Sequence, residues 1–328
     1  MRRRDFIALA GGLTAIWPLA ARAQQDNRVR HIGVFMNLPE GDPDATRWIA
    51  ALLKSLDEFG WTEGRNIRLE FRWGIDAAHV QKNAEELVAL NPDVIVAASP
   101  PAVLALKQTT RTVPIIFVTV TDPVALGLVE SLARPGGNAT GFSGAELGLS
   151  AKWLQVLKEM APALSRVAVF HNPVNLGAIP QFSAIEAAAP SLGIALSIID
   201  VRDKAAIEQA VAAFANAPNG GLLTLRISEN VEFRDSLVAL AAKYRLPAIY
   251  PLRVFATSGG LASYGPNPAE EYRDAAGYVD RVLRGEKPAN LPIQVSSKYQ
   301  LVINLKTAKS LNLALPQTLL ATADEVLE

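Results

Sequence analysis

The feature that most constrains this sequence is an α/β pattern that runs once and then starts again. Apolar segments alternate with amphipathic ones, which is typical of parallel strands joined by helices. Residues 93–143 predict strand, helix, strand, turn and strand, and residues 221–264 predict the same order. Residues 113–117 (VPIIF) also resemble residues 246–250 (LPAIY). Any α/β chain has such a rhythm, but the repeat of whole units predicts two similar lobes that face each other.

The pattern covers the chain from residue 30 onward. We expect strands at residues 30–35, 67–73, 93–98, 113–120, 140–143, 166–171, 195–200, 221–225, 247–250, 260–264 and 294–304. We expect helices at residues 45–59, 77–90, 101–110, 126–132, 150–160, 177–192, 204–215, 228–243 and 268–283, and a last helical stretch at 307–311. Ligands bind beyond the carboxyl ends of the strands in open α/β sheets. Two facing lobes would therefore share one cleft.

The composition agrees with sheets that are buried on both faces. Half of the residues are hydrophobic and only 7% are aromatic, with no cysteine, so neither a disulfide nor a thiolate metal site is expected. Without residues 1–23, which carry four Arg and one Asp, 28 basic and 31 acidic residues remain. This slight acidic excess argues against a nucleic-acid partner, which would need a basic face.

The first 23 residues predict an export signal. Arg2 to Arg4 form a basic start, residues 6–21 are apolar, and Ala21 and Ala23 are spaced as a signal peptidase requires. We expect cleavage after Ala23 and a periplasmic protein, exported by the general secretory or the twin-arginine route. The alternative is an uncleaved anchor, but Gly and Pro interrupt a stretch shorter than the roughly 20 residues that span a membrane. Lipid anchoring is not expected, because there is no cysteine.

Motifs for catalysis or metal binding are absent from the sequence. The three histidines, His31, His79 and His171, have no metal-ligand spacing, and only His171 falls at a strand end. There is no GxSxG elbow, Walker loop or GxGxxG after the first strand. We therefore expect no catalytic residue, metal ion or cofactor. An exported α/β enzyme with a dispersed acid–base pair remains an alternative.

Small polar and aromatic residues cluster where the predicted strands end, which is where a small polar solute would be held by hydrogen bonds. The candidate ligand-binding residues are Ser99, Pro100, Thr121, Asp122, Gly141, Ser143, Asn172, Pro173, Asn175, Ser228, Tyr250 and Tyr264. Thr119 and Glu229 occur beside them. Each Ser, Thr, Asp or Asn could instead be an ordinary helix cap. The interpretation therefore rests on their shared location.

Five stretches carry a resemblance to a known family: residues 92–97, 112–118, 121–124, 133–141 and 304–308. They resemble the ABC transporter substrate-binding family that includes tryptophan/tyrosine-type receptors. The resemblance implies a periplasmic-binding-protein type I fold, in which two Rossmann-like lobes with parallel sheets are joined by three crossovers. It divides the chain into a first lobe at 29–143 with 258–286 and a second lobe at 144–257 with 287–328.

The resemblance also implies a ligand in the cleft, near residues 99–100, 121–122, 141–143 and 172–173. Two departures bear on the solute: His171 stands where Tyr or Phe is frequent, and residues 226–229 (RISE) replace a more usual Asp-Asn turn. We expect a monomeric receptor that delivers a small polar or amino-acid-like molecule to an ABC permease in the inner membrane. The alternative is a ligand-sensing subunit that signals to a membrane kinase.

Overall fold

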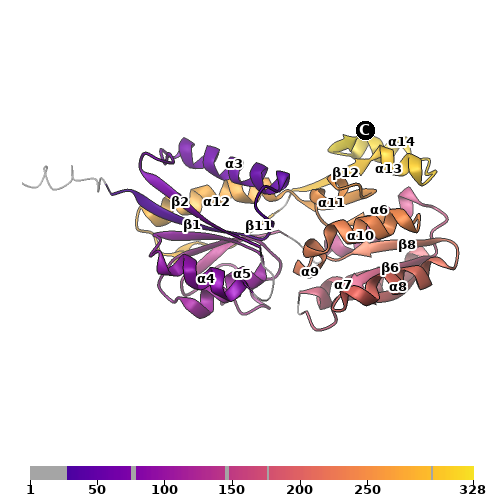
Figure 1. Cartoon of the computed structure of the whole chain (residues 1–328), viewed down its shortest axis with the longest axis horizontal. Helices are drawn as coiled ribbons and strands as arrows, with labels where there is room; N and C mark the ends of the chain where they lie inside the picture. Colours follow the sequence, from indigo (N-terminus) through magenta and orange to yellow (C-terminus); the bar gives the residue numbers. More distant parts are fainter. Residues whose placement is uncertain (1–27, 75–78, 145–147, 176, 297) are drawn as a thin grey trace, which may run out of the picture.

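The computed structural model describes residues 28–74, 79–144, 148–175, 177–296 and 298–328. The side chains of Lys204 and Ser228 are outside this description, as is the expected export segment at residues 1–23. Figure 1 shows two lobes side by side, each built on its own sheet. The predicted fold class, α/β with two lobes, is confirmed.

The sheet of the first lobe is entirely parallel. Its six strands have the order β11-β5-β4-β3-β1-β2. The strands are β1 (Arg30–Met36), β2 (Ile67–Trp73), β3 (Val94–Ala98), β4 (Ile115–Val120), β5 (Ala139–Ser143) and β11 (Gln294–Val295). The helices are α3 (Pro43–Glu58), α4 (Val80–Ala89), α5 (Pro100–Thr109), α12 (Pro268–Leu283) and the 3-10 turn η2 (Pro288–Asn290).

Both faces of this sheet are buried, which explains the continuous apolar strands of the sequence. In β1, Ile32 and Val34 point into the core shared with α3 and α12, whereas Phe35 points into a separate core with α4 and α5. In Figure 1 the two helix pairs lie on opposite sides of the sheet. Trp48 of α3 stacks on Tyr272 of α12 with ring centroids 5.8 Å apart. This contact anchors α12, which comes from late in the sequence, to the first lobe.

The sheet of the second lobe has seven strands in the order β13-β12-β10-β9-β8-β6-β7. All neighbours are parallel except β10 and β12. The strands are β6 (Arg166–His171), β7 (Ala195–Asp200), β8 (Gly220–Thr224), β9 (Ala248–Tyr250), β10 (Ala262–Pro266), β12 (Tyr299–Asn304) and β13 (Glu325–Leu327). The helices are α6 (Gly148–Met160), α7 (Ala178–Ala188), η1 (Ala189–Leu192), α8 (Lys204–Ala215), α9 (Ser228–Glu232), α10 (Arg234–Lys243), α11 (Arg253–Thr257), α13 (Leu305–Ser310) and α14 (Gln317–Thr322).

The chain passes between the lobes three times, as the resemblance implied. It crosses from β5 to α6, from β10 to α12, and from β11 to β12. Two predicted borders need correction. Residues 262–266 were expected in the first lobe, but β10 pairs with β9 and β12 in the second sheet. Residues 294–295 were expected in the second lobe, but β11 pairs with β5 in the first sheet.

Two predicted elements are wrong. The strand expected at 294–304 is two strands in different sheets, because the third crossover lies between them. The helix expected at 126–132 is a series of turns. Gly127 there adopts a left-handed φ of 66°, and the N–H of Leu128 donates to the carbonyl of Pro123. In the part of the chain that the structure describes, no helix combines the length and apolarity needed to cross a bilayer.

Candidate functional site

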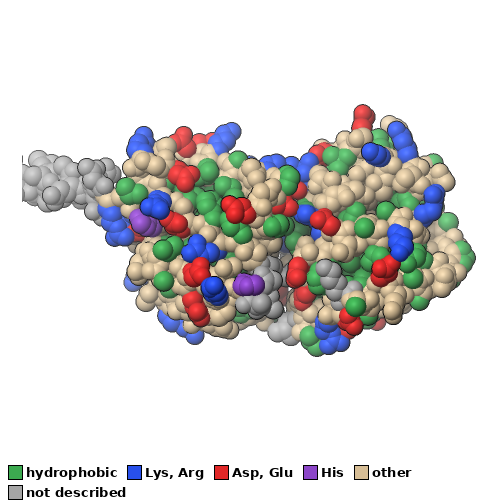
Figure 2. Space-filling view, in the orientation of Figure 1, with side chains coloured by type: hydrophobic (Ala, Val, Ile, Leu, Met, Phe, Trp, Pro, Cys, Tyr) green, Lys and Arg blue, Asp and Glu red, His purple; other side chains and the backbone are tan. Residues whose placement is uncertain are grey.

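A cavity of about 490 Å³ lies where the two lobes meet, at the carboxyl ends of strands from both sheets. Figure 2 shows the crevice between the lobes on one face of the molecule. The cavity is lined by Asn37, Val80, Ser99, Pro100, Pro101, Leu104, Thr119, Thr121, Leu126, Asn175, Gly177, Arg226, Ile227, Glu229, Val231, Glu232 and Leu252. Each lobe therefore contributes both polar and apolar groups to one space.

The first lobe contributes polar atoms that lack hydrogen-bond partners. Ser99 follows β3, Thr119 lies near the end of β4, and Asn37 follows β1. The Ser99 Oγ, Thr119 Oγ1 and Asn37 Oδ1 atoms are buried and make no hydrogen bond within the described ranges of the chain. Leaving such an atom unpaired costs about 1–3 kcal/mol. Three such atoms at one wall indicate that this wall forms hydrogen bonds to a ligand in the cavity.

The backbone at this wall is strained. Ser99 and Thr119 have φ values of 78° and 56°, a region that residues other than glycine adopt rarely. The register between β4 and β5 shifts between Phe117 and Val120, so Thr119 leaves the regular ladder. Its N–H instead donates to Glu271 Oε2 on α12 at 2.6 Å. Strained residues persist only where the surrounding structure holds them, and they are typical of ligand sites.

The second lobe contributes a carboxylate that is held by two amides. Asn172 Nδ2 donates to Glu229 Oε1 at 2.6 Å, and Asn175 Nδ2 lies 3.1 Å from Glu229 Oε2. Asn230 fixes the turn before Glu229, because its Nδ2 donates to the carbonyls of Phe170 and Leu225. The amides orient the Glu229 carboxylate without cancelling its charge. It can therefore attract a cationic group in the cavity.

Arg226, two residues beyond the end of β8 in the second lobe, is a buried cation of the site. Gln181 holds its backbone by accepting from the Arg226 N–H at 2.9 Å and donating to the Arg226 carbonyl at 3.2 Å. Its Nη2 lies 3.7 Å from Oε1 of Glu271 in the first lobe, with exposures of only 5% and 3% for the two side chains. Burial lowers the pKa of Arg226 and raises that of Glu271, and each charge opposes the shift of the other.

The apolar part of the cavity wall is aliphatic. Leu104 and Pro101 on α5 and Leu126 belong to the first lobe, and Val231 and Leu252 to the second. No Phe, Tyr or Trp lines the cavity among the residues that the structure describes. A ligand here would place an apolar group against aliphatic side chains.

A larger groove, of about 720 Å³, runs along α12 and reaches the third crossover at Gln294 and Lys298. Its charged side chains largely pair with one another or with near neighbours, as in Arg273–Asp274 at 3.0 Å and Arg281–Glu286 at 2.7 Å. The groove also includes Glu271, whose Oε1 makes no hydrogen bond to a described residue, but the cleft brings together four residues with such atoms, Asn37, Ser99 and Thr119 from the first lobe and Arg226 from the second. We therefore assign the candidate site to the cleft.

The predicted site residues fall into two groups. The structure places Ser99, Pro100, Thr121 and Asn175 in the cavity wall, and Asn172 behind it through Glu229. Ser228 begins α9, and its side chain is not described. The residues that do not line the cavity are Asp122, Gly141, Ser143, Pro173, Tyr250 and Tyr264.

Several of these have evident structural roles instead. Asp122 Oδ1 accepts from the N–H of Ala125 in a turn, and a Cβ on Gly141 would lie 2.0 Å from the Phe117 carbonyl oxygen. Tyr250 is 1% exposed and stacks on Phe255 at 4.9 Å, and burial raises its pKa. These three residues therefore belong to the framework of the lobes.

Asn37 and Arg226 line the cavity but were not predicted to do so. Arg226 directly follows the strand predicted at 221–225, and Asn37 lies two residues beyond the one predicted at 30–35; this position at a strand end could have identified both. His171, the one histidine at a strand end, is 4% exposed and contacts Phe182 edge-on at 5.0 Å. It does not line the cavity.

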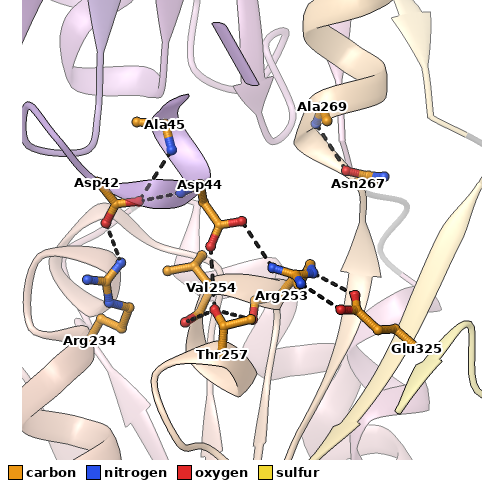
Figure 3. A network of polar contacts seen from close by, with 10 residues as sticks. All are labelled: Asp42, Asp44, Ala45, Arg234, Arg253, Val254, Thr257, Asn267, Ala269 and Glu325. Carbon is orange, nitrogen blue, oxygen red and sulfur yellow. Dashed lines mark hydrogen bonds and ion pairs between the residues drawn. The ribbon is translucent and has the colours of Figure 1, made fainter. Parts of the chain in front are cut away.

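The lobes also meet at a network of ion pairs beside the cleft (Figure 3). Arg234 Nη1, at the start of α10, donates to Asp42 Oδ2 at 2.9 Å. Arg253 Nη1, at the start of α11, donates to Asp44 Oδ1 at 3.3 Å, and its other nitrogens bind Glu325 at 2.6 Å each. Two acidic residues at the beginning of α3 therefore face two arginines of the second lobe.

Known proteins resemble this chain in sequence and in fold. A tyrosine-binding protein of Clostridioides difficile (strain R20291) is 26% identical over 268 residues, which cover 80% of this chain and 75% of the relative. A conserved domain protein of Vibrio cholerae has a TM-score of 0.82 and 27% identity, covering 91% of this chain and 100% of its own. A Streptococcus pneumonia ABC domain in complex with L-Trp also has a TM-score of 0.82, with 23% identity and coverage of 91% and 99%.

The family of ABC transporter substrate binding proteins matches residues 41–327, which is most of the 328 residues. The two-lobed fold, the shared cleft and the resemblance seen in the sequence agree with this match. The chain therefore belongs to the ABC transporter substrate-binding proteins, a family of binding proteins rather than of enzymes.

Proposed function

We propose that the cavity between the lobes binds an amino acid with a large apolar side chain. Its volume of about 490 Å³ suits a small molecule, since ligand sites commonly measure roughly 300–1,000 Å³. The wall carries one guanidinium, Arg226, and two carboxylates, Glu232 and the amide-held Glu229. Opposite charges beside aliphatic side chains match a zwitterion with an apolar tail. The relatives that bind tyrosine and L-Trp support the same class.

One observation carries the proposal: the unpaired buried atoms of Ser99, Thr119 and Asn37. Because each costs free energy while it lacks a partner, a ligand that hydrogen-bonds to them gains more than it would at a solvated surface. These atoms belong to the first lobe, whereas Arg226 and Glu229 belong to the second. A ligand that contacts both sets stabilises the closed arrangement of the lobes.

Closure then presents both lobes to the importer. The three crossovers are the hinge, and the ion pairs at Asp42 and Asp44 form between the lobes. We propose that the closed protein docks as a monomer on an ABC permease in the inner membrane, after export to the periplasm and cleavage behind Ala23. Intact-mass measurement of the exported protein checks the cleavage site, and light scattering checks the monomer.

A thermal-shift screen of the mature protein tests the solute class. The panel holds the L-amino acids, with neutral sugars as a matched negative set. A ligand present at a hundred times its Kd stabilises the folded state by about 2.7 kcal/mol. We expect one or more large apolar amino acids to raise the Tm and the sugars to have no effect. No response to any amino acid, or a response to sugars alone, would contradict the proposal.

Two variants test whether the ligand binds in the cavity. Ser99→Ala removes an unpaired hydroxyl of the wall, so it should weaken binding roughly fivefold, about 1 kcal/mol for one hydrogen bond, without unfolding the protein. Tyr250→Phe is the matched control, because it removes a buried unpaired hydroxyl outside the cavity wall. Isothermal titration calorimetry measures both. Equal affinities for the two variants would show that the ligand binds elsewhere.

A further inference from the structure

Arg226 has buried hydrogen-bond donors that the described residues leave unused. Its Nη1 and Nη2 atoms are buried and make no hydrogen bond to any residue that the structure describes, although a guanidinium carries five N–H donors. Glu271 Oε1 is 3.7 Å from Nη2, which is an ion pair without hydrogen-bond geometry. Arg226 also lines the cavity, so a ligand there is adjacent to a guanidinium whose terminal nitrogens lack acceptors in the described part of the chain. A carboxylate is the group that the planar guanidinium fork binds bidentately.

Glu271 cannot be that carboxylate. Its Oε2 already accepts the N–H of Thr119 at 2.6 Å, which ties the side chain to the end of β4. Glu271 is also part of α12, whose Tyr272 packs against Trp48 in the core of the first lobe. It therefore supplies a fixed counter-charge from the opposite lobe and leaves the hydrogen-bonding capacity of Arg226 unused.

Gly144 makes room for this arrangement. It follows β5 at the start of the first crossover, and a Cβ on it would lie 2.4 Å from both Arg226 Nη1 and Glu271 Oε1. The contact is with two side chains that meet between the lobes, so a methyl group here must displace the guanidinium, the Glu271 carboxylate or both. The position of Arg226 at the cavity thus depends on the absence of a side chain at residue 144.

We propose that Arg226 is the specificity-determining residue of the cavity, that it binds the carboxylate of the ligand, and that Gly144 is a positioning residue that lets the guanidinium reach it. The proposal rests on the proposed function and deepens it. It assigns the carboxylate to the second lobe and leaves the hydroxyls of the first lobe for the rest of the ligand.

The test compares each amino acid found in the screen with its carboxamide, which has the same shape without the negative charge. Calorimetry gives the ratio of the two affinities. We expect the wild-type protein to favour the acid by at least about tenfold, since charge-assisted hydrogen bonds are roughly twice as strong as neutral ones. In Arg226→Gln the ratio should fall to within about threefold. Arg226→Lys keeps the charge without the fork, so its ratio should lie between the two.

Two controls separate recognition from folding. Arg234→Gln removes another arginine that pairs across the lobes but does not line the cavity, so it should keep the wild-type ratio. Gly144→Ala should lower the ratio, whereas Gly148→Ala, whose new methyl group would meet no atom within 4 Å, should not. A merely structural defect weakens acid and amide equally and leaves the ratio unchanged.

The outcomes distinguish this inference from the proposed function. If no amino acid binds, both fail. If an amino acid binds but the acid-to-amide ratio is near one, or persists in Arg226→Gln, only the role of Arg226 is overturned. A ligand that lacks a carboxylate altogether would overturn it as well. If Arg226→Gln does not fold, the ratios for Arg226→Lys and Gly144→Ala decide, and wild-type values in both refute the inference.

Discussion

Asp42 stabilises the protein in two ways that substitutions can separate: it caps α3, and it pairs with Arg234 of the other lobe. Its Oδ1 caps α3 by accepting from the N–H groups of Asp44 and Ala45 at 2.8 and 3.3 Å. Its Oδ2 accepts from Arg234 Nη1 of the other lobe at 2.9 Å, with side-chain exposures of 4% and 17%. Asp42→Asn keeps an oxygen for the cap and removes the charge from the ion pair. Asp42→Ala removes both.

The expected losses of folding free energy follow from these contacts. Loss of the cap costs about 1 kcal/mol of stability. The bond to Arg234 is charge-assisted and mostly buried, which suggests about 1.5–3 kcal/mol. We use the lower value, because Arg234 retains Asp235 as a partner at 2.8 Å. We therefore expect a loss of about 1.5 kcal/mol in Asp42→Asn and about 2.5 kcal/mol in Asp42→Ala.

Asp203 provides the matched control, because it caps α8 in the same way. Its Oδ1 accepts from Ala205 and Ala206 at 3.0 and 3.3 Å on an exposed surface within one lobe. Asp203→Ala should cost about 1 kcal/mol and Asp203→Asn at most about 0.5 kcal/mol. Urea unfolding followed by circular dichroism measures all four variants. If Asp42→Asn is no more destabilising than Asp203→Asn, the interlobe contact contributes nothing and the reasoning is refuted.

Three further predictions concern the framework of the lobes. Gly141→Ala should destabilise the protein by at least about 3 kcal/mol in urea unfolding, because its Cβ would overlap the Phe117 carbonyl. A milder effect would show that β4 and β5 can move apart to make room for the methyl group. Burial lowers the pKa of His171 below 6.5, so the folded state resists protonation and the protein loses stability as the pH falls below 6.5. His171→Phe should make the Tm less dependent on pH in this range, and an unchanged dependence would contradict the assignment. Tyr250→Phe removes a buried hydroxyl without a partner, so the Tm should stay level or rise, and a large fall would indicate an unrecognised hydrogen bond.

The sequence predicted the fold well where local pattern decides it. Strands such as β1 and β3 are apolar on both faces, and amphipathic helices such as α3 and α12 follow from their spacing. It could not predict which sheet a strand joins, because pairing partners lie far apart in the chain. For this reason the expected lobe borders misplace β10 and β11, and the pattern at residues 294–304 predicts one strand where the structure has two.

Prediction of the site succeeded in location and failed in detail. Strand ends in α/β sheets point to the cleft, and Ser99, Thr121 and Asn175 lie there. Position at a strand end does not tell which way a side chain points, so Tyr250 was proposed for the cleft although it is part of the core. Arg226 follows a predicted strand, but its burial, its missing hydrogen bonds and its ion pair with Glu271 of the other lobe depend on tertiary contacts that the sequence does not show.

The central claim is that an amino acid binds between the lobes and contacts both. A crystal structure of the mature protein with the amino acid that gives the largest thermal shift tests this most directly. We predict density in the cleft within hydrogen-bonding distance of Ser99 and Thr119 on one side and of Arg226 and Glu229 on the other. Density in the groove along α12, or contacts with one lobe alone, would contradict the account.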